Sequence, residues 1–510
     1  MRRSLALAVS LLVVGCVDDP RDPNTWIKKL NDPREGKDAV RELVKIKDKA
    51  AVPPLIDLYK KGKDAEVLRA ISTFKDPRAV PIMIDALDYS EDSFDAAAIA
   101  ANALGDTPDP SAVEPLMATL KKPLPIKTRA NIVKLEAMKA LGKIGDKRAV
   151  DALDKVLSTS ADDQDFFLNK TAAGQLARFN DPKSVPFLIR GLFMTGRGAD
   201  IFAECRTALV GIGEPAVQPL VDAMNRKNAE LEADAKKYEF IPGIIVQKTA
   251  ILLGDIRSKT AVPALLAELK KPDDGLKKGV SGHQSVIIAL GLIGSPDVKA
   301  PLLAILTDAK QPNKLRAAAA EALNGAGDTS ALPALLKIAN ESFINMKSHE
   351  IDAEHGALVA AAATAYSRLA WAEQANVTWQ KLPADLEESD AHVVFKNASA
   401  RLEVAKACKK DVACYAKMLD DKDSAKAEKA ALMLGRLGKP GVDELAKAVG
   451  VSDLSVRMTV LVGLAQAGKA SPEVRAALAK QIELDDGKPM IKKAGVVDEM
   501  RVVLAQISRG

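Results

Sequence analysis

A unit of about 35 residues recurs along the chain and constrains its fold more than any other feature. Each unit has an apolar helical stretch ending in Leu-Gly or a similar pair, a turn with Gly, Asp or Pro, and a second helical stretch opening on Ala-Val-Pro, as at Leu141–Val150. The Val of this second stretch serves as an anchor, and its regular return between Val52 and Leu332 sets the period. Such a period indicates a stack of repeats. The anchors are Val52, Val80, Val113, Val150, Val185, Val217, Val262, Lys299 (a weak match) and Leu332.

The residues around each anchor predict where the second helix starts. Proline is tolerated only in the first turn of a helix, where its missing N–H costs nothing, so the helix begins just before the anchor. Apolar residues at positions 0, +3, +4 and +7 then form one helix face, as in Val80, Met83, Ile84 and Leu87. In the turn, Gly supplies a left-handed residue and Asp accepts a backbone N–H. The prolines that follow an anchor are Pro81, Pro186, Pro263 and Pro333.

The repeat predicts an all-α fold and resembles a known family. Only 4% of residues are aromatic while 47% are hydrophobic, which favours closely packed helices over aromatic-rich sheets. The period and the Asp-Pro turn resemble the HEAT family, especially the short HEAT-like repeats of bacterial proteins, over Ala39–Leu478 without 340–405. The resemblance implies an α-solenoid of about 12 helix pairs, a right-handed superhelix whose second helices line the concave side. It does not imply one biochemical function.

Two segments interrupt the repeat. Asn225–Pro242 lengthens the gap before Val262, and Ala375–Glu388, with Pro383 and acidic residues, is expected to be an inserted loop. The gap between Leu332 and Val442 is close to three periods, so two degenerate repeats are expected between them, and Val474 adds one more.

Residues 1–15 have the pattern of an export signal. Arg2 and Arg3 precede the apolar run Leu5–Val14, which covers about 15 Å as a helix, half of a bilayer's hydrocarbon core. Val-Val-Gly-Cys, ending at Cys16, resembles the bacterial lipobox, which implies that Cys16 is lipidated and becomes the first mature residue. An ordinary signal peptide with an incidental cysteine, or a buried N-terminal cysteine, is the alternative. We expect a signal peptide at 1–15, a polar tether at 16–24 and the solenoid at 25–510.

This leader predicts a lipid-anchored membrane protein of the bacterial cell envelope. Val17 follows the cysteine, in place of the Asp that resembles an inner-membrane retention signal in some bacteria. The sequence therefore favours the outer membrane, with the solenoid facing the periplasm.

The charge of the chain favours no class of partner. Loss of Arg2 and Arg3 with the signal peptide leaves 71 Lys and Arg against 68 Asp and Glu. Lysine pairs occur at the C-terminal ends of several second helices, where cations complement the helix dipole. We prefer this explanation to a basic stripe that binds nucleic acid. No nucleic-acid partner is predicted. The pairs are Lys60-Lys61, Lys121-Lys122 and Lys270-Lys271.

Catalysis finds little support in the sequence. Deoxyhypusine hydroxylases, a family of HEAT-repeat enzymes, hold two irons with several His-Glu dipeptides, whereas this chain has one, His349-Glu350, and four histidines in all. His349, Asp352 and His355, with Glu350 and Glu354 beside them, could line one side of a helix and hold zinc. The alternative is a charged, solvated helix end. No phosphate-binding loop, nucleophile elbow or Cys-x-x-Cys pair occurs, so no enzyme activity, catalytic residue or cofactor is predicted.

Charged residues at position +5 from the anchors predict a binding surface. This position lies opposite the packed face, and in a HEAT-like stack it faces the groove, a surface that solenoids use for binding. Solvated helix faces are usually charged as well, which is the alternative explanation. The predicted protein-binding residues are Asp57, Asp85, Lys155, Arg190, Asp222 and Lys337.

The remaining cysteines are Cys205, Cys408 and Cys414. In one continuous helix the last two would point about 240° apart, too far around to bond. Asp411 is a good N-cap, however, and a chain turn before it would let the two sulfurs meet. In an exported chain this favours a Cys408–Cys414 disulfide over two separate buried thiols, and Cys205 is expected to stay free.

Together these features predict a non-enzymatic, lipid-anchored scaffold that binds other proteins along the groove of a HEAT solenoid. The alternatives are a metal-dependent enzyme that uses His349–His355, and a lyase-like or regulatory factor. The latter would need a pocket for a chromophore or effector, to which nothing in the sequence points.

Overall fold

The computed structural model describes residues 19–88, 93–122, 131–273, 275, 279–344, 350, 352–382, 390–468 and 470–509. Their regular structure is helical apart from one short hairpin, β1 (Thr195–Gly196) and β2 (Ala199–Asp200), which pair in antiparallel register. The prediction of an all-α solenoid of helix pairs is confirmed. Residues 1–15, Cys16 and His349 lie outside the described residues. No helix in the described ranges is both long and apolar enough to cross a membrane.

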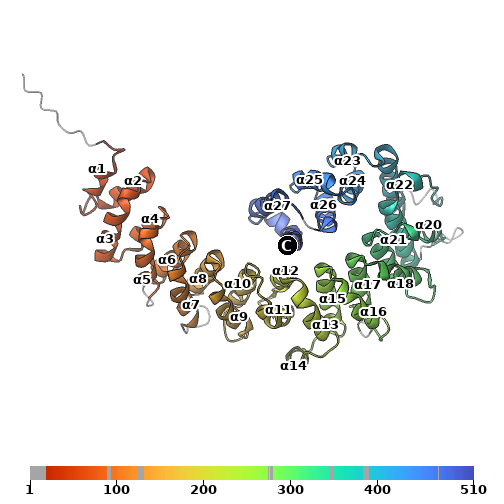
Figure 1. The fold of residues 1–510 in the computed structure, drawn as a ribbon, viewed down its shortest axis with the longest axis horizontal. Helices are drawn as coiled ribbons and strands as arrows, with labels where there is room; N and C mark the ends of the chain where they lie inside the picture. Colours follow the sequence, from red (N-terminus) through yellow and green to blue (C-terminus); the bar gives the residue numbers. More distant parts are fainter. Residues whose placement is uncertain are drawn as a thin grey trace, which may run out of the picture. The chain divides into compact units, whose positions relative to one another are not determined.

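The chain forms two compact units, each a stack of helices (Figure 1). Unit 1 comprises the chain up to Val156 together with Asp163–Thr171. Its first helix begins at Pro23, inside the expected 16–24 tether. The helices are α1 (Pro23–Ile27), α2 (Gly36–Ile46), α3 (Val52–Gly62), α4 (Ala65–Ser72), α5 (Val80–Ala86), α6 (Phe94–Asp106), α7 (Val113–Lys121), α8 (Asn131–Ile144), α9 (Val150–Ser158), whose last residues belong to unit 2, and α10 (Phe166–Leu176), which continues into unit 2.

Unit 2 comprises Leu157–Asp162 and the chain from Ala172 onward. It contains α11 (Val185–Gly191), α12 (Phe202–Ile212), α13 (Val217–Met224), α14 (Ala229–Lys237), α15 (Ile244–Ile256), α16 (Val262–Glu268), α17 (Gly282–Ile293), α18 (Pro296–Thr307), α19 (Asn313–Gly325), α20 (Leu332–Ala339), α21 (Ala353–Leu369), α22 (Asp390–Cys408), α23 (Val412–Met418), α24 (Ser424–Arg436), α25 (Lys439–Lys447), α26 (Leu454–Ala467), α27 (Pro472–Asp485), α28 (Pro489–Lys493) and α29 (Val496–Ser508).

Eight of the nine anchors are the first residue of a helix, as their prolines predict. A single 3-10 turn precedes each of these helices, a feature that the sequence interpretation missed. In most repeats an Asp before this turn accepts a backbone N–H two residues on, as Asp181 does from Lys183 at 3.1 Å. Lys299, the weak match, lies inside α18. The helices that begin at an anchor are α3, α5, α7, α9, α11, α13, α16 and α20.

Glycines of the Leu-Gly pairs lie inside the first helices, where neighbouring repeats touch. A Cβ added at Gly254 of α15 would meet the Ala289 Cα of α17 at 2.8 Å, and one added at Gly291 of α17 would meet the Ala322 Cα at 2.5 Å. These glycines therefore serve close helix packing. The left-handed residue expected at the helix end comes later, as at Gly294 with φ +63°.

Unit 2 closes on itself through its first helices. Each helix of the series α12, α15, α17, α19, α21, α22, α24, α26 and α29 packs against the next, and α29 packs back on α12. The C-terminal end of the chain therefore lies beside α12 (Figure 1). The nine helices of this series make a ring, which neither the repeat nor its period predicted.

In unit 2, helices that begin at anchors, such as α13, α16 and α20, lie on the outer side of this ring (Figure 1). In unit 2 the implied placement of second helices on the concave side is therefore wrong. The physical reason is helix spacing. A curved stack is tightest at its inner row, and the Gly and Ala contacts at Gly254 and Gly291 let the first helices approach most closely.

The segment expected as an inserted loop near residue 380 is packed where it is described. Trp379 lies against Tyr366 and Phe395, with ring centroids 5.8 and 5.7 Å away, and its Nε1 donates to Ser399 Oγ at 3.1 Å. Residues 375–382 have no helix or strand, which agrees with the expectation, and 383–388 lie outside the described residues.

Candidate functional site

A cavity of about 460 Å³ lies in unit 2 where the expected insertion Asn225–Pro242 meets the stack. Its wall comes from the turn at 157–162, the end of α11, the insertion with α14, and the start of α15. Pockets that bind small molecules usually measure about 300–1,000 Å³. The sequence pointed to this place by the long gap before Val262 and by Arg190, a predicted groove residue that lines the cavity.

Arg190 fixes α14 against α11 on one side of the cavity. Its guanidinium donates to both carboxylate oxygens of Asp234, at 2.8 and 3.2 Å, and to Glu230 at 3.0 Å. The Asp234 carboxylate raises the pKa of Arg190 above its ordinary value. Arg190 is thus a half-buried structural residue, and its charge is already balanced by two carboxylates of the insertion.

Lys248 of α15 also lines the cavity, in a different electrostatic setting. Its ammonium donates to the Leu192 carbonyl at 2.6 Å and lies 5.3 and 5.0 Å from the ring centroids of Phe193 and Phe202. Burial lowers the pKa of Lys248, and the charge of Asp200 opposes that shift. No carboxylate of the described residues forms an ion pair with it.

The rest of the wall is largely aromatic and aliphatic. Phe193 and Phe240 stack with centroids 5.3 Å apart, and Ile244 lies beside them in the lining. Tyr238 and Ile241 leave 52% and 53% of their surface exposed. Both residues line the cavity, so part of its apolar wall is open to solvent.

The six predicted groove residues are divided between the units. Asp57, Asp85 and Lys155 lie in unit 1 and are exposed, while Arg190, Asp222 and Lys337 lie in unit 2 on outer helices. Asp57, Asp85 and Lys337 form no ion pair with any described residue. Asp222 is half-buried and accepts a bond from Gln218 at 3.0 Å.

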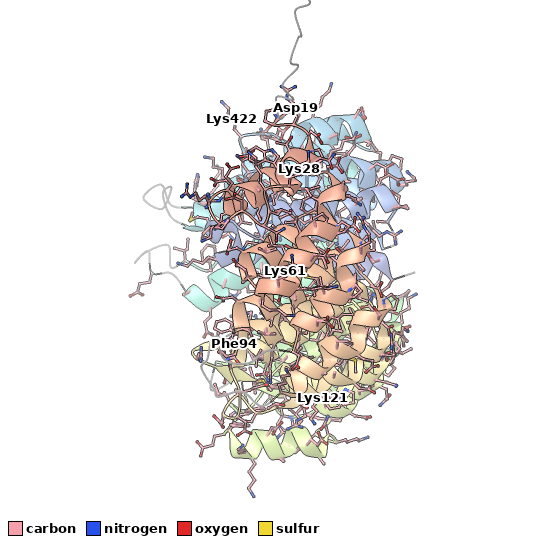
Figure 2. All side chains as sticks on the ribbon, turned by 90° about the vertical axis from the view of Figure 1, so that its left-hand side faces the viewer. Asp19, Lys28, Lys61, Phe94, Lys121 and Lys422 are labelled. Atoms are coloured by element: carbon pink, nitrogen blue, oxygen red, sulfur yellow. A yellow bond between two sulfur atoms is a disulfide. The ribbon has the colours of Figure 1, made fainter. Side chains whose placement is uncertain are left out.

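One lysine of each helix-end pair has a local partner. Lys122 pairs with Asp88 at 3.1 Å, Lys61 donates to Asn31 at 3.4 Å, and Lys271 pairs with Glu268. Figure 2 shows Lys61 and Lys121 at separate levels along unit 1. This placement agrees with their interpretation as helix-terminal cations.

The histidine segment has structural contacts in its described part. Asp352 caps α21 by accepting from the His355 backbone N–H at 3.0 Å, and His355 Nε2 lies 3.4 Å from Glu341. His283 is buried, with Nε2 3.1 Å from the Glu268 carbonyl. Within the described ranges, no three His, Cys, Asp or Glu residues are grouped to hold a metal ion.

A disulfide joins Cys408 to Cys414, with Cα atoms 5.3 Å apart. The chain turns at Lys409, whose φ is +52°, and Asp411 caps α23 by accepting from the backbone of Ala413 and Cys414. Cys205 is a buried free thiol, and burial raises its pKa.

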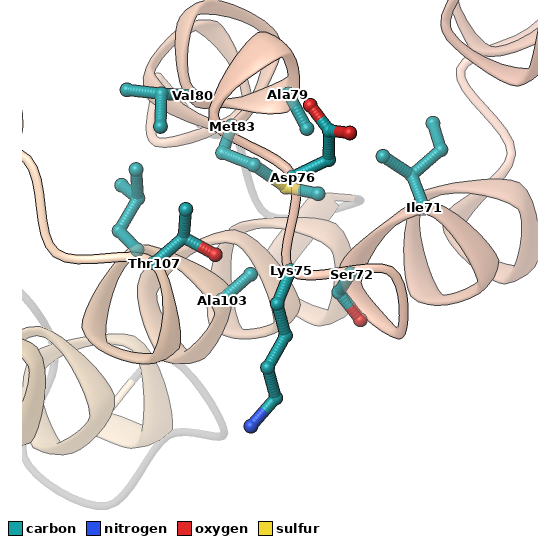
Figure 3. A pocket seen from close by; sticks show the side chains of 10 residues that line it. Ile71, Ser72, Lys75, Asp76, Ala79, Val80, Met83, Ala103 and Thr107 are labelled. Carbon is teal, nitrogen blue, oxygen red and sulfur yellow. The ribbon is translucent and has the colours of Figure 1, made fainter. Parts of the chain in front are cut away.

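A second hollow, in unit 1 between α4, α5 and α6, is too small for a ligand. It measures about 10 Å³, roughly the space of one water molecule. Asp76 lies at its edge (Figure 3), held by the guanidinium of Arg78 at 2.8 and 2.9 Å. The larger cavity, in unit 2, is therefore the better candidate for a binding site.

Comparison with known proteins supports the repeat. The model of the HEAT repeats family matches residues 91–165 and 283–344. Among solved structures, human deoxyhypusine hydroxylase in complex with glycerol is 18% identical over 60% of this chain and 96% of its own, with a TM-score of 0.22. The CpcE–CpcF complex of phycocyanin lyase from Nostoc sp. PCC7120 is 20% identical over 63% and 94%, with a TM-score of 0.24. Importin beta is 12% identical over 96% and 83%, with a TM-score of 0.27. No curated protein sequence matches the chain.

Proposed function

We propose that the chain is a non-enzymatic interaction scaffold of the bacterial cell envelope, tethered to the outer membrane through a lipid on Cys16 and facing the periplasm. The observation that carries the scaffold role is a pair of exposed carboxylates, Asp57 and Asp85, which form no ion pair with a described residue. We call these two residues the charged row of unit 1. Asp57 and Asp85 occupy the same position in successive second helices of unit 1, α3 and α5. Repeated, unpaired charges on a rigid stack suit recognition of another protein.

The row predicts which partners unit 1 selects. Two carboxylates on neighbouring repeats attract a basic segment and contribute to its rate of association and its register. Both side chains are exposed, so the fold does not depend on their charges.

Crosslinking followed by capture from envelope membranes tests the scaffold role. The double charge reversal Asp57→Lys with Asp85→Lys is expected to lose the crosslinked partners while the melting curve stays within about 1 °C. Asp95→Lys is the matched control, because Asp95 is exposed in unit 1 but belongs to a first helix, α6. Equal capture of partners by the parent, the double variant and Asp95→Lys would show that the charged row does not bind a partner.

Membrane fractionation tests the anchor. Cys16→Ser removes the thiol that would carry the lipid, so the variant is expected in the soluble envelope fraction and the parent in the membrane fraction. A variant that sediments with membranes as fully as the parent would disprove the anchor and leave the scaffold role to the capture experiment.

A further inference from the structure

Two cations of the unit 2 cavity, Lys237 and Lys248, form no ion pair with a described residue, and of the two only Lys248 is half-buried. Three cationic side chains line it: Arg190, Lys237 and Lys248. Arg190 is balanced by Asp234 and Glu230, and Lys237 is exposed and donates to the Tyr238 hydroxyl. Lys248 is half-buried, and its one hydrogen bond to a described residue goes to a neutral carbonyl.

The nearest acidic groups do not take the place of a partner. Asp200 influences Lys248 through its charge, but its carboxylate caps the start of α12 by accepting from the Phe202 N–H at 3.1 Å. Asp234, on the cavity wall, forms a bidentate ion pair with Arg190. An ammonium has three donors, and removing it from water without an anion is unfavourable. A ligand anion would therefore be stabilised at Lys248.

The surface next to Lys248 is apolar. Phe193 lies against its ammonium, Phe240 stacks on Phe193, and Ile244 is one helical turn away from Lys248 on α15. These groups can cover an aliphatic or aromatic body but offer it no hydrogen bonds. The acidic lining residues Asp162 and Glu239 disfavour an anion elsewhere in the cavity.

We propose that this cavity binds an apolar organic acid. The carboxylate lies at Lys248, and an aliphatic or aromatic body fills the space along Phe193, Phe240 and Ile244 toward the mouth at Tyr238 and Ile241. The volume of about 460 Å³ suits a molecule of small-ligand size. The inference is independent of the scaffold role, because the charged row of unit 1 has no part in it.

Calorimetric titration of the full chain with decanoate and 2-naphthoate tests the proposal. Both acids are expected to bind. Decanol has the same chain length, but its neutral hydroxyl cannot form an ion pair with Lys248, so it is expected to bind at least about 10-fold more weakly. The free acid and the carboxyl end of a peptide share this chemistry. A peptide ending in Phe, with a free or an amidated carboxyl group, distinguishes these two sources.

Lys248→Gln is the decisive variant. Glutamine can still donate to the Leu192 carbonyl but carries no charge, so decanoate binding is expected to fall about 10-fold or more while decanol binding stays unchanged. Lys237→Gln is the control, since it removes a cation at the rim and should keep the affinity of the parent. Ile244→Ala leaves the charge and should weaken both decanoate and decanol.

Two results would overturn the proposal. One is the absence of binding heat with either acid at millimolar concentration. The other is that the parent and a folded Lys248→Gln variant bind decanoate with equal affinity. Loss of partner capture in the crosslinking experiment would leave the outcome unaffected, so failure of the scaffold role and failure of this site are distinguishable.

Discussion

Arg206 of α12 and Glu499 of α29 form an ion pair of 2.8 Å although 293 positions separate them in the chain. The same guanidinium donates to both oxygens of Asp255, at 2.6 and 3.1 Å. Burial lowers the pKa of Arg206, but the charges of Asp255 and Glu499 outweigh it and raise that pKa above its ordinary value. This contact holds the two ends of unit 2 together.

Arg206→Ala is expected to open the ring. The substitution leaves the buried carboxylate of Asp255 unpaired, which costs about 3–5 kcal/mol. Hydrogen exchange of the α29 amides should accelerate before that of α17 or α19. Arg501→Ala is the control, because its pairs with Asp486 and Asp498 are more exposed and contribute about 1 kcal/mol or less. Unchanged protection of α29 in Arg206→Ala would refute the role of this contact in closure.

Gly254→Ala is expected to destabilise unit 2 although alanine is the better helix former. The added methyl group would stand 2.8 Å from the Ala289 Cα, and such overpacking costs about 1–3 kcal/mol, more than the gain in helix propensity of about 1 kcal/mol. In Gly174→Ala, also within a helix of unit 2, the nearest atom is the Glu204 Cγ at 3.8 Å. The control should therefore raise the urea midpoint while Gly254→Ala lowers it. A rise for both would mean that the first helices can separate at little cost.

Asp76 should make part of the stability of unit 1 dependent on acid pH. The hydrogen bonds from Arg78 hold the pKa of this buried carboxylate at about 2. Between that value and its unfolded pKa near 3.8, the unfolded chain binds a proton and the folded chain does not, so the stabilisation is complete above about pH 5 and is lost toward pH 2. Asp76→Asn should cost about 1–2 kcal/mol at pH 7, measured by hydrogen exchange of α4 and α5, and much less at pH 2. A stability difference between the parent and Asp76→Asn that stays the same from pH 7 to pH 2 would contradict the assignment.

The three cysteines Cys205, Cys408 and Cys414 should all resist alkylation in the native, non-reduced protein, for two different reasons. Without reductant, peptides holding Cys408 and Cys414 are expected to remain linked after digestion. Cys205 should be alkylated only after unfolding, because it is fully buried and its raised pKa leaves little thiolate. Mass spectrometry of native and urea-treated samples measures both. Alkylation of Cys408 in the native, non-reduced protein would exclude the disulfide.

The sequence by itself determined the helical class of the elements and where most second helices begin. The proline after an anchor fixes its own φ, and the Asp before the anchor accepts a hydrogen bond from the backbone two residues on. Both effects are local, so Val80 and Val185 begin helices wherever the repeat lies in the stack. The turn between Cys408 and Cys414 was predictable for the same reason, because Asp411 marks a helix start locally.

Only the tertiary structure decided which distant residues meet. Arg190 has the position of a solvent-facing residue in its repeat, yet it pairs with Asp234, because the insertion that carries Asp234 folds back over α11. Whether the first or the second helices form the inner row, and whether α29 reaches α12, depends on small rotations added from repeat to repeat. Those rotations depend on packing distances such as that between Gly254 and Ala289, which no local pattern specifies. The closure of unit 2 and the cavity beside Lys248 therefore arise from the summed geometry of many repeats, while each repeat is specified by its own residues.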